Sequence, residues 1–183
     1  MAKIGKYVVM GEVGRGAACV VYSTLDPDVG RQVAVKTVAK ALARPGDIER
    51  LQFEAQIGGK LNHSNIANVY EYGEDGYGAW VAMEMVDGKT LRQHLSEGYR
   101  ASLEPLPSLV TEILEGLDYA HARGVLHGDL RAENVLVSTS GAAKLIGFLG
   151  AGDEQADVRA AAAMLKECFA EAPPLLAQRR TRE

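Results

Sequence analysis

Hydrophobic and polar residues alternate through much of the first half of the chain, which is the pattern of strands with one buried face. The segments 6–13, 19–25 and 31–38 are rich in β-branched and aromatic residues, and turns separate them. Two more segments of this kind, 66–74 and 78–86, flank a glycine-rich turn. The pattern therefore predicts five strands before residue 87.

One helix interrupts these strands, over residues 47–61. Ile48, Leu51 and Ala55 recur at helical spacing, so they share one face. Asp47 is of the residue type that caps helix N-termini, and Gly58 weakens the end of the segment. We expect Asp47 to cap this helix.

From Asp87 onward the pattern becomes helical, which places a lobe boundary near this residue. We expect a short helix over 90–98, a longer one over 105–124, short strands over 134–138 and 142–146, and a last helix over 155–170. The longer helix carries one apolar stripe, formed by Leu106, Leu109, Val110, Ile113, Leu114 and Leu117. The expected units are residues 1–86, 87–172 and a basic tail, 173–183.

Composition narrows the class of protein. The apolar fraction of 47% is that of a globular domain, and the net charge of −4 gives no reason to expect a nucleic-acid partner. No apolar run is long enough for a membrane span, and the N-terminus lacks the core of a signal peptide. Cys19 and Cys168 match no metal-ligand spacing. We expect a cytoplasmic protein.

A glycine-rich turn and a lysine provide the first candidate chemistry. In "VGRGAACVVY", 13–22, glycines between two strands allow the backbone to approach phosphate groups closely. Lys36 ends the strand-like "VAVK", and Glu54 lies eighteen residues further on, within the predicted helix. A partly buried Lys36–Glu54 pair would fix the ammonium group as a point charge for phosphate oxygens.

The loop "HGDLRAEN", 127–134, carries the second set of candidates. Asp129 has the chemistry to accept a hydroxyl proton, and Arg131 to neutralise charge on a transferring phosphoryl group. Asn134 offers a hard oxygen to Mg²⁺. These three residues are the predicted catalytic and metal-binding set of the loop.

Taken in order, these segments resemble the protein kinase family, and within it the bacterial Ser/Thr kinases of the eukaryotic type. The resemblance rests on "VGRGAACVVY", "VAVK", "HSNI" (63–66), "AMEMVDGKTL" (82–91), "HGDLRAEN" and "IGFLG" (146–150). It implies an α+β fold of two lobes: a five-stranded antiparallel N-lobe sheet with one helix, and a reduced, mainly helical C-lobe. It also implies ATP as cofactor, with Mg²⁺ or Mn²⁺ in active members.

The resemblance further assigns residues to nucleotide binding. Met83 takes the gatekeeper position, and the backbone of Glu84 and Val86 would bind adenine. Catalytic roles fall to Lys36, Asp129 and Arg131, and the metal to Asn134. The full nucleotide set implied by the resemblance is Val13, Gly14, Gly16, Val21, Ala34, Lys36, Glu54, Met83, Glu84, Val86 and Leu136.

Several positions depart from the family pattern. Gly147 replaces the metal-binding aspartate, Gly128 replaces the arginine before Asp129, and Cys19 replaces the third glycine of the turn. Gly58 stands where the family has a bulky apolar residue, so we expect a cavity that loosens the helix around it. Asp153 and Glu154 are candidates to replace the missing carboxylate.

The segment after Gly147 is also short. The family has a long activation segment there, whereas this chain passes within a few residues to "QADVRAAAAMLKECF", 155–169. That helix resembles a C-lobe helix with a buried aspartate, which would be Asp157. The resemblance therefore implies that the activation segment is absent and the C-lobe truncated.

Three functions stay open at this point. The first is a pseudokinase or very weak kinase that binds ATP and acts through a protein partner, with a homodimer among the options. The second is an active Ser/Thr kinase with a non-standard metal site. The third is a small-molecule phosphotransferase of the aminoglycoside-kinase type, because "HGDLRAEN" also resembles the loop of those enzymes.

Overall fold

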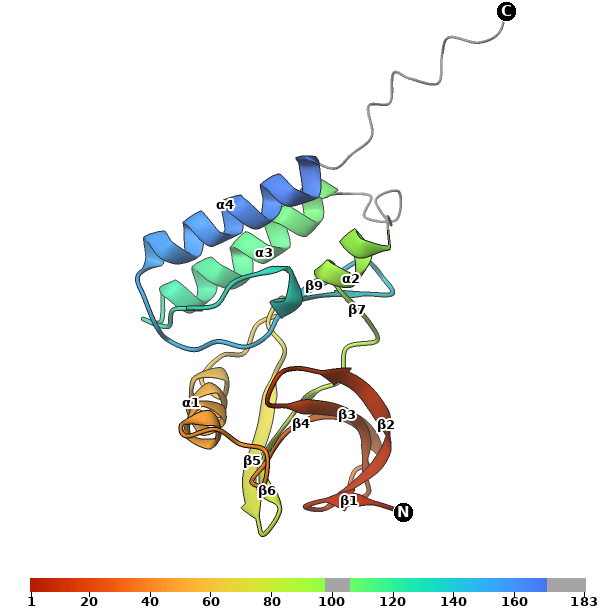
Figure 1. Ribbon diagram of the computed structural model, residues 1–183. Coiled ribbons are helices and arrows are strands. Elements are labelled where there is room, and N and C mark those ends of the chain that lie inside the picture. The colour runs from red at the N-terminus through yellow and green to blue at the C-terminus, as the bar shows by residue number, and fades with distance from the viewer. Residues whose placement is uncertain (98–105, 171–183) are drawn as a thin grey trace, which may run out of the picture.

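The computed structural model describes residues 1–97 and 106–170, which form two sheets and several helices (Figure 1). The larger sheet has six antiparallel strands in the order β1-β2-β3-β4-β6-β5. Its strands are β1 (Lys3–Ile4), β2 (Tyr7–Arg15), β3 (Val20–Asp26), β4 (Arg31–Ala39), β5 (Val69–Asp75) and β6 (Gly78–Glu84). All five predicted strands are present, and the prediction of five was one short, because the two-residue β1 carries no periodic signal.

The larger sheet curls strongly on itself. The Tyr7 hydroxyl on β2 donates a hydrogen bond of 2.7 Å to Glu71 Oε2 on β5, although three strands separate β2 and β5 in the sheet order. The Trp80 indole packs inside this curl, edge-on to Tyr7. It fills the place of a side chain at Gly73, where a Cβ would lie only 2.2 Å from the indole.

Helix α1 (Asp47–Gly58) packs beside β5 and β6 (Figure 1). Leu51 and Ala55 bury against Val38, Ala79 and Val81 of the sheet. The expectation that Asp47 caps this helix is wrong. Gly46 occupies the cap position without a side-chain hydrogen bond, and the Asp47 carboxylate accepts instead from the Arg44 N–H at 2.7 Å.

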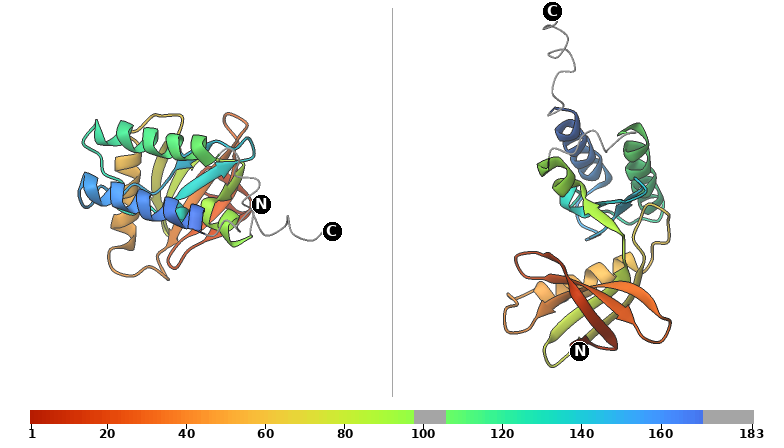
Figure 2. Two further views of the ribbon diagram at one scale, coloured as in Figure 1. Left: turned by 90° about the horizontal axis from the view of Figure 1, so that it is seen from above. Right: turned by 90° about the vertical axis from the view of Figure 1, so that its right-hand side faces the viewer.

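The second part of the molecule combines a small sheet with helices. Strands β7 (Gly88–Thr90), β8 (Val135–Ser138) and β9 (Ala143–Leu145) pair antiparallel in that order. The helices are α2 (Leu91–Ser96), α3 (Leu106–His121), α4 (Glu154–Ala170) and the 3₁₀ turn η1 (Ala132–Asn134). Helices α3 and α4 lie side by side over the small sheet (Figures 1 and 2).

The core of this second part follows the predicted stripe, with one correction. Leu109, Ile113 and Leu117 of α3 are buried, but Leu114 is 43% exposed. The fully buried residues of the described stripe therefore repeat at i and i+4, Val110 is half-buried, and the side chain of Leu106 lies outside the described part. Strand β7 was not predicted, because three residues are too few to show a period.

The predicted basic tail, 173–183, lies outside the described residues. No helix within the described ranges is both long and apolar enough to cross a bilayer.

Candidate functional site

Lys36 and Glu54 form a close ion pair between β4 and α1. The Lys36 ammonium donates to both carboxylate oxygens of Glu54, at 2.9 and 2.7 Å. The two side chains are 24% and 11% exposed. Since β4 pairs with β3 and β6, Lys36 stands in the middle of the sheet, opposite Val21 and Val81. The pair thus fixes a positive charge at a rigid position.

The predicted glycine-rich turn connects β2 to β3 as a tight hairpin. Gly14 pairs with Val21, and the Gly16 N–H donates to the Cys19 carbonyl at 2.8 Å. The Cys19 sulfur lies only 3.0 Å from where a Cβ of Gly16 would be. Gly16 and Cys19 therefore lie close together at the end of the hairpin. Val13 precedes it at the end of β2, where its side chain is 49% exposed.

The remaining predicted nucleotide residues lie on strands of both sheets and on the segment that follows β6. Ala34 on β4 pairs with Met83 on β6. Glu84 ends β6 and Val86 follows it, and Leu136 lies on β8 directly opposite Lys144 of β9. Met83 also lines a cavity of about 20 Å³ together with Glu54, Gly58, Gly147 and Phe148. Glu54, the partner of Lys36, thus lines one small cavity together with the gatekeeper position and the Gly147 segment.

Gly58 lines a cavity as expected, but this cavity is small. A Cβ at Gly58 would lie 2.6 Å from Val69 Cγ2, so the β5 side chain occupies the space of a residue at this position. The cavity that Gly58 helps to line has room for only about one water molecule. Val69 of the neighbouring strand thus fills most of the space at Gly58, and the loosening of α1 packing stays a prediction.

The catalytic-loop residues converge around Asp129. Asn134 Nδ2 donates to the Asp129 carbonyl at 2.7 Å and lies 3.4 Å from its carboxylate. Arg131 Nε lies 3.7 Å from one carboxylate oxygen of Asp129, and Arg50 Nη2 lies 3.7 Å from the other. Asp129 therefore faces two guanidinium groups.

Gly147 lies beside Asn134, on the loop that leaves β9. A Cβ built at Gly147 would be 3.3 Å from Asn134 Oδ1, the oxygen that was predicted to bind a metal. The backbone at Gly147 has a φ of +79°, a conformation that glycine adopts readily and that aspartate and asparagine tolerate better than most residues. The position opposite the asparagine oxygen therefore carries no ligand atom.

The residues present do not fit a magnesium site. Within the described ranges, no three His, Cys, Asp or Glu side chains gather as metal ligands. Asp153 Oδ1 accepts from the Ala156 N–H at 2.7 Å at the start of α4, and its side chain is 70% exposed. Glu154 is exposed in the first turn of the same helix. The exposed positions of Asp153 and Glu154 do not support either residue as a replacement for the missing carboxylate.

Asp157 of α4 holds the catalytic loop from below. Its carboxylate is buried and accepts from the backbone N–H groups of His127 at 2.7 Å and Gly128 at 2.9 Å, and it contacts His121 Nε2 at 2.8 Å. Burial alone would raise the pKa of the Asp157 carboxyl, but these hydrogen bonds outweigh it and hold the pKa below its usual value. The expected burial of Asp157 is confirmed.

The segment that replaces a long activation segment packs against both the loop and α1. Leu149 N–H donates to the His127 carbonyl at 2.7 Å, and Gly150 N–H to the Leu126 carbonyl at 3.0 Å. A Cβ at Gly128, whose φ is +76°, would lie 2.7 Å from the Ala151 carbonyl oxygen. An arginine at residue 128 would therefore collide with this segment, so the two departures from the family pattern are structurally coupled.

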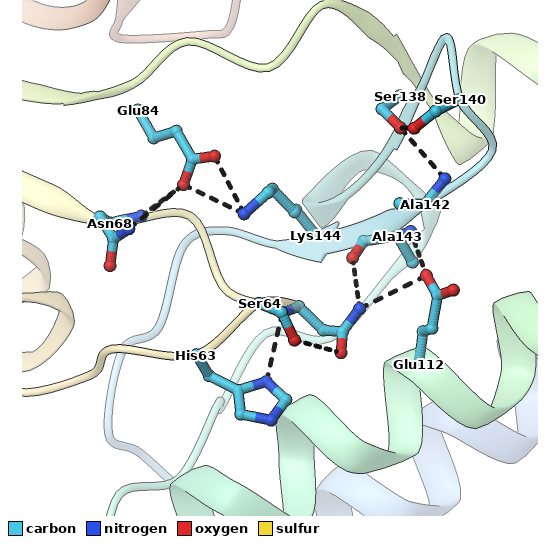
Figure 3. A network of polar contacts seen from close by, with 11 residues as sticks. His63, Ser64, Asn68, Glu84, Glu112, Ser138, Ser140, Ala142, Ala143 and Lys144 are labelled. Atoms are coloured by element: carbon cyan, nitrogen blue, oxygen red, sulfur yellow. Dashed lines mark hydrogen bonds and ion pairs between the residues drawn. The ribbon is translucent and has the colours of Figure 1, made fainter.

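Two charged residues of this region were missed by the sequence reasoning. Arg50 lies four residues before Glu54 on α1, so helical spacing was a usable signal that it faces the same side. Lys144 forms ion pairs of 2.9 and 3.2 Å with the two carboxylate oxygens of Glu84 (Figure 3). No signal in the sequence could have found that pair, because sixty residues separate the partners.

Comparison with known proteins gives a consistent family. The model of the protein kinase domain matches residues 7–180. A probable serine/threonine-protein kinase of Streptomyces coelicolor is 38% identical over 149 residues, which cover 79% of this chain and 22% of that protein. The probable serine/threonine-protein kinase PknB of Lactococcus lactis is 36% identical over 155 residues, covering 81% and 25%. The chain thus spans about a quarter of the length of these curated relatives.

A solved structure supports the same relationship. The crystal structure of the Mycobacterium tuberculosis PknI kinase domain superposes with a TM-score of 0.73 at 29% identity, covering 93% of this chain and 74% of that one. The curled sheet with one helix and the smaller helical part are thus shared with a bacterial kinase domain.

Proposed function

The chain belongs to the protein kinase domain family, and on this premise we propose that it is a pseudokinase: it binds ATP, transfers phosphate very weakly or not at all, and acts by binding a protein partner. The relatives carry the names of Ser/Thr kinases, which favours this class over a small-molecule phosphotransferase.

One observation carries the proposal. Gly147 lies opposite the Asn134 side-chain oxygen, where phosphoryl-transfer chemistry in this family requires a carboxylate on the metal ion. Asn134 alone offers one neutral oxygen, which is a poor ligand set for Mg²⁺. The loss of metal-mediated charge neutralisation lowers the rate by roughly 10³-fold or more, at about 1.4 kcal/mol per factor of ten.

The retained charges support nucleotide binding without a metal. Lys36, held by Glu54, presents a fixed ammonium group to phosphate oxygens. Arg131 and Arg50 add two guanidinium groups near Asp129. Val13, Val21, Ala34 and Leu136 would enclose the adenine ring, and ATP would supply the triphosphate that these cations neutralise.

An active Ser/Thr kinase with a non-standard metal site is the second candidate. The observation that favours it is the intact contact between Asn134 and the Asp129 carbonyl, which keeps the candidate base in a fixed orientation. In that case a metal ion would have to be held by the nucleotide phosphates with Asn134 as its protein ligand.

A protein partner is the remaining part of the proposal, and a second copy of the chain is one form of it. The missing metal ligand at Gly147 supports this part, because a domain of this family without transfer chemistry can act only through binding. Light scattering of the purified chain across a concentration series tests the homodimer directly.

The deciding experiment is a calorimetric ATP titration of the chain in EDTA and in excess Mg²⁺, combined with a γ-phosphate transfer assay. We expect binding of similar strength in both conditions. Lys36→Met should weaken it at least tenfold, because the ammonium contact to the phosphates is lost.

Transfer in the presence of Mg²⁺ or Mn²⁺ that Asp129→Asn abolishes would overturn the pseudokinase and establish the second candidate. Lys166→Met, a substitution of an exposed lysine on α4, is the matched control and should leave ATP binding unchanged. A chain that does not bind ATP in either condition would refute both candidates.

A further inference from the structure

Glu84 sits at the junction of three segments that are far apart in the sequence (Figure 3). It ends β6 and begins the segment Glu84–Asp87, here called the hinge, that leads into β7. Asn68 precedes β5, and Lys144 belongs to β9 of the small sheet. The contacts between these three residues connect the larger sheet to the small one.

Backbone and side chain of Glu84 are held together. Its N–H donates to the Asn68 carbonyl at 2.8 Å, while its carboxylate accepts from the Asn68 N–H at 3.2 Å. This reciprocal pair fixes the Glu84 backbone relative to its own carboxylate. Any group that anchors the carboxylate therefore also anchors the backbone.

Lys144 is that group. Its ammonium lies 2.9 and 3.2 Å from the two carboxylate oxygens, and the two side chains are only 20% and 23% exposed. Such a pair is less screened by solvent than one at the open surface. Lys144 is also directly opposite Leu136 across β8 and β9, and residues directly opposite share one face of a sheet.

We propose that Lys144 is a positioning residue for the adenine base: it holds the hinge, through Glu84, in register with Leu136. This inference rests on the proposed nucleotide binding and adds a residue to it. Leu136 and the Glu84 backbone contact the base under that proposal, so Lys144 sets the distance between two walls of the base site. It acts on the base and not on the phosphates.

The effect of Lys144 is therefore separable from that of Lys36. Lys144→Met should weaken adenosine and ATP by the same factor, roughly fivefold, as expected for losing one partly buried charged contact. Lys36→Met should weaken ATP and leave adenosine unchanged, because adenosine has no phosphate. Both affinities are measured by calorimetry on the 183-residue chain.

Conservative variants distinguish positioning from general destabilisation. Lys144→Arg keeps the charge and should bind both ligands like the original chain. Glu84→Gln should match Lys144→Met, and the double variant should be no weaker than either single one. Lys166→Met on α4 is the matched control and should change neither affinity. Equal adenosine binding before and after Lys144→Met, or a loss confined to ATP, would refute the inference.

Hydrogen exchange tests the anchoring without any ligand. In the free chain, Lys144→Met should speed exchange of the Asn68 and Glu84 amides severalfold, while α3 amides such as that of Leu117 exchange as before. Unchanged exchange at Asn68 and Glu84 refutes the inference even if the chain binds no nucleotide. Faster exchange in a chain that binds no nucleotide leaves the anchor standing but refutes its role in base binding, and the proposed function fails separately.

Discussion

The two halves of the candidate site have kept different amounts of their chemistry. On the larger sheet, Lys36 and Glu54 form a tight, partly buried pair on rigid elements. On the small sheet and its loops, Asp129 and Asn134 keep their contact, but Gly147 offers no ligand atom. Under the proposed function, binding of phosphates and metal-assisted transfer depend on different halves, so one can persist where the other is lost.

The difference also extends to what supports each half. The lysine half rests on a continuous sheet, whereas the Asp129 half rests on a loop held by the buried carboxylate of Asp157 and by the short segment after Gly147. Loops need side-chain anchors because they lack a regular hydrogen-bond ladder. Substitutions in the Asp129 half should therefore have larger effects on activity and stability than substitutions in the lysine half.

Gly147→Asp is the substitution with the largest expected effect, because it would give the Asp129 half the carboxylate ligand that it lacks. The φ of +79° is one that aspartate tolerates, and its carboxylate would begin next to Asn134 Oδ1. We expect Mg²⁺-dependent ATP binding to appear and phosphate transfer to rise by roughly two to three orders of magnitude.

Gly147→Asn is the matched control, since asparagine shares the backbone preference but lacks the charge. Radiolabelled transfer assays and metal titrations compare the two variants. If the aspartate and asparagine variants behave alike, Gly147 does not stand at a metal-ligand position, and the Asp129 half has not lost a metal carboxylate there.

Asp157→Ala tests the support of the Asp129 half. It would leave the buried His127 N–H and the partly buried Gly128 N–H without their acceptor, which should lower the free energy of unfolding by about 3 kcal/mol. Urea denaturation measures it. Asp153→Ala, which removes an exposed cap of the same helix, should cost only about 1 kcal/mol. Equal costs for the two substitutions would contradict the anchoring role.

The pH dependence of stability should report the same loop. Burial lowers the pKa of His127 to about 4, so the folded chain keeps this ring neutral while the unfolded chain protonates it below about pH 6.5. The unfolded state then binds more protons, and the free energy of unfolding should fall by roughly 2 to 3 kcal/mol as pH drops from 6.5 to 4.

The loss due to His127 ends near pH 4. The depressed pKa of Asp157 contributes a separate loss only below the ordinary aspartate pKa, as its carboxylate is protonated. Denaturation of the original chain and of His127→Phe across this range isolates the histidine, because the other histidines are common to both. A stability difference that does not change with pH would show that His127 is accessible to protons in the folded chain.

Arg92→Ala should have the smallest effect. Arg92 of α2 bonds Glu133 in η1 and both carboxylate oxygens of Glu167 in α4, and these contacts hold the pKa of the guanidinium above its usual value. The three side chains are between 35% and 45% exposed, so solvent screens them and the cost should stay below about 1 kcal/mol. Melting curves at low and high salt check this, and a loss that salt does not reduce would contradict it.

Much of the fold could be predicted because its signals are local. The five longer strands and the helices appeared as periodic patterns within short windows, and the order of Lys36, Glu54, Asp129 and Asn134 indicated the family. The missed β1 and β7 are too short to show a period. The Asp47 cap failed because Gly46 takes that position, and the cavity at Gly58 is small because Val69, from another element, fills most of the space.

The sequence by itself determined which chemical groups this protein has and which it lacks: a lysine, a loop carboxylate and an asparagine, and a glycine where the family pattern has a metal-binding aspartate. Only the tertiary structure decided which of these groups meet. The pairing of Lys144 with Glu84, of Arg50 with Asp129, and the contact of Ala151 with Gly128 join residues far apart in the chain. The physical reason is that periodicity and side-chain chemistry are properties of short segments, whereas charge pairing and steric fit depend on how distant segments pack.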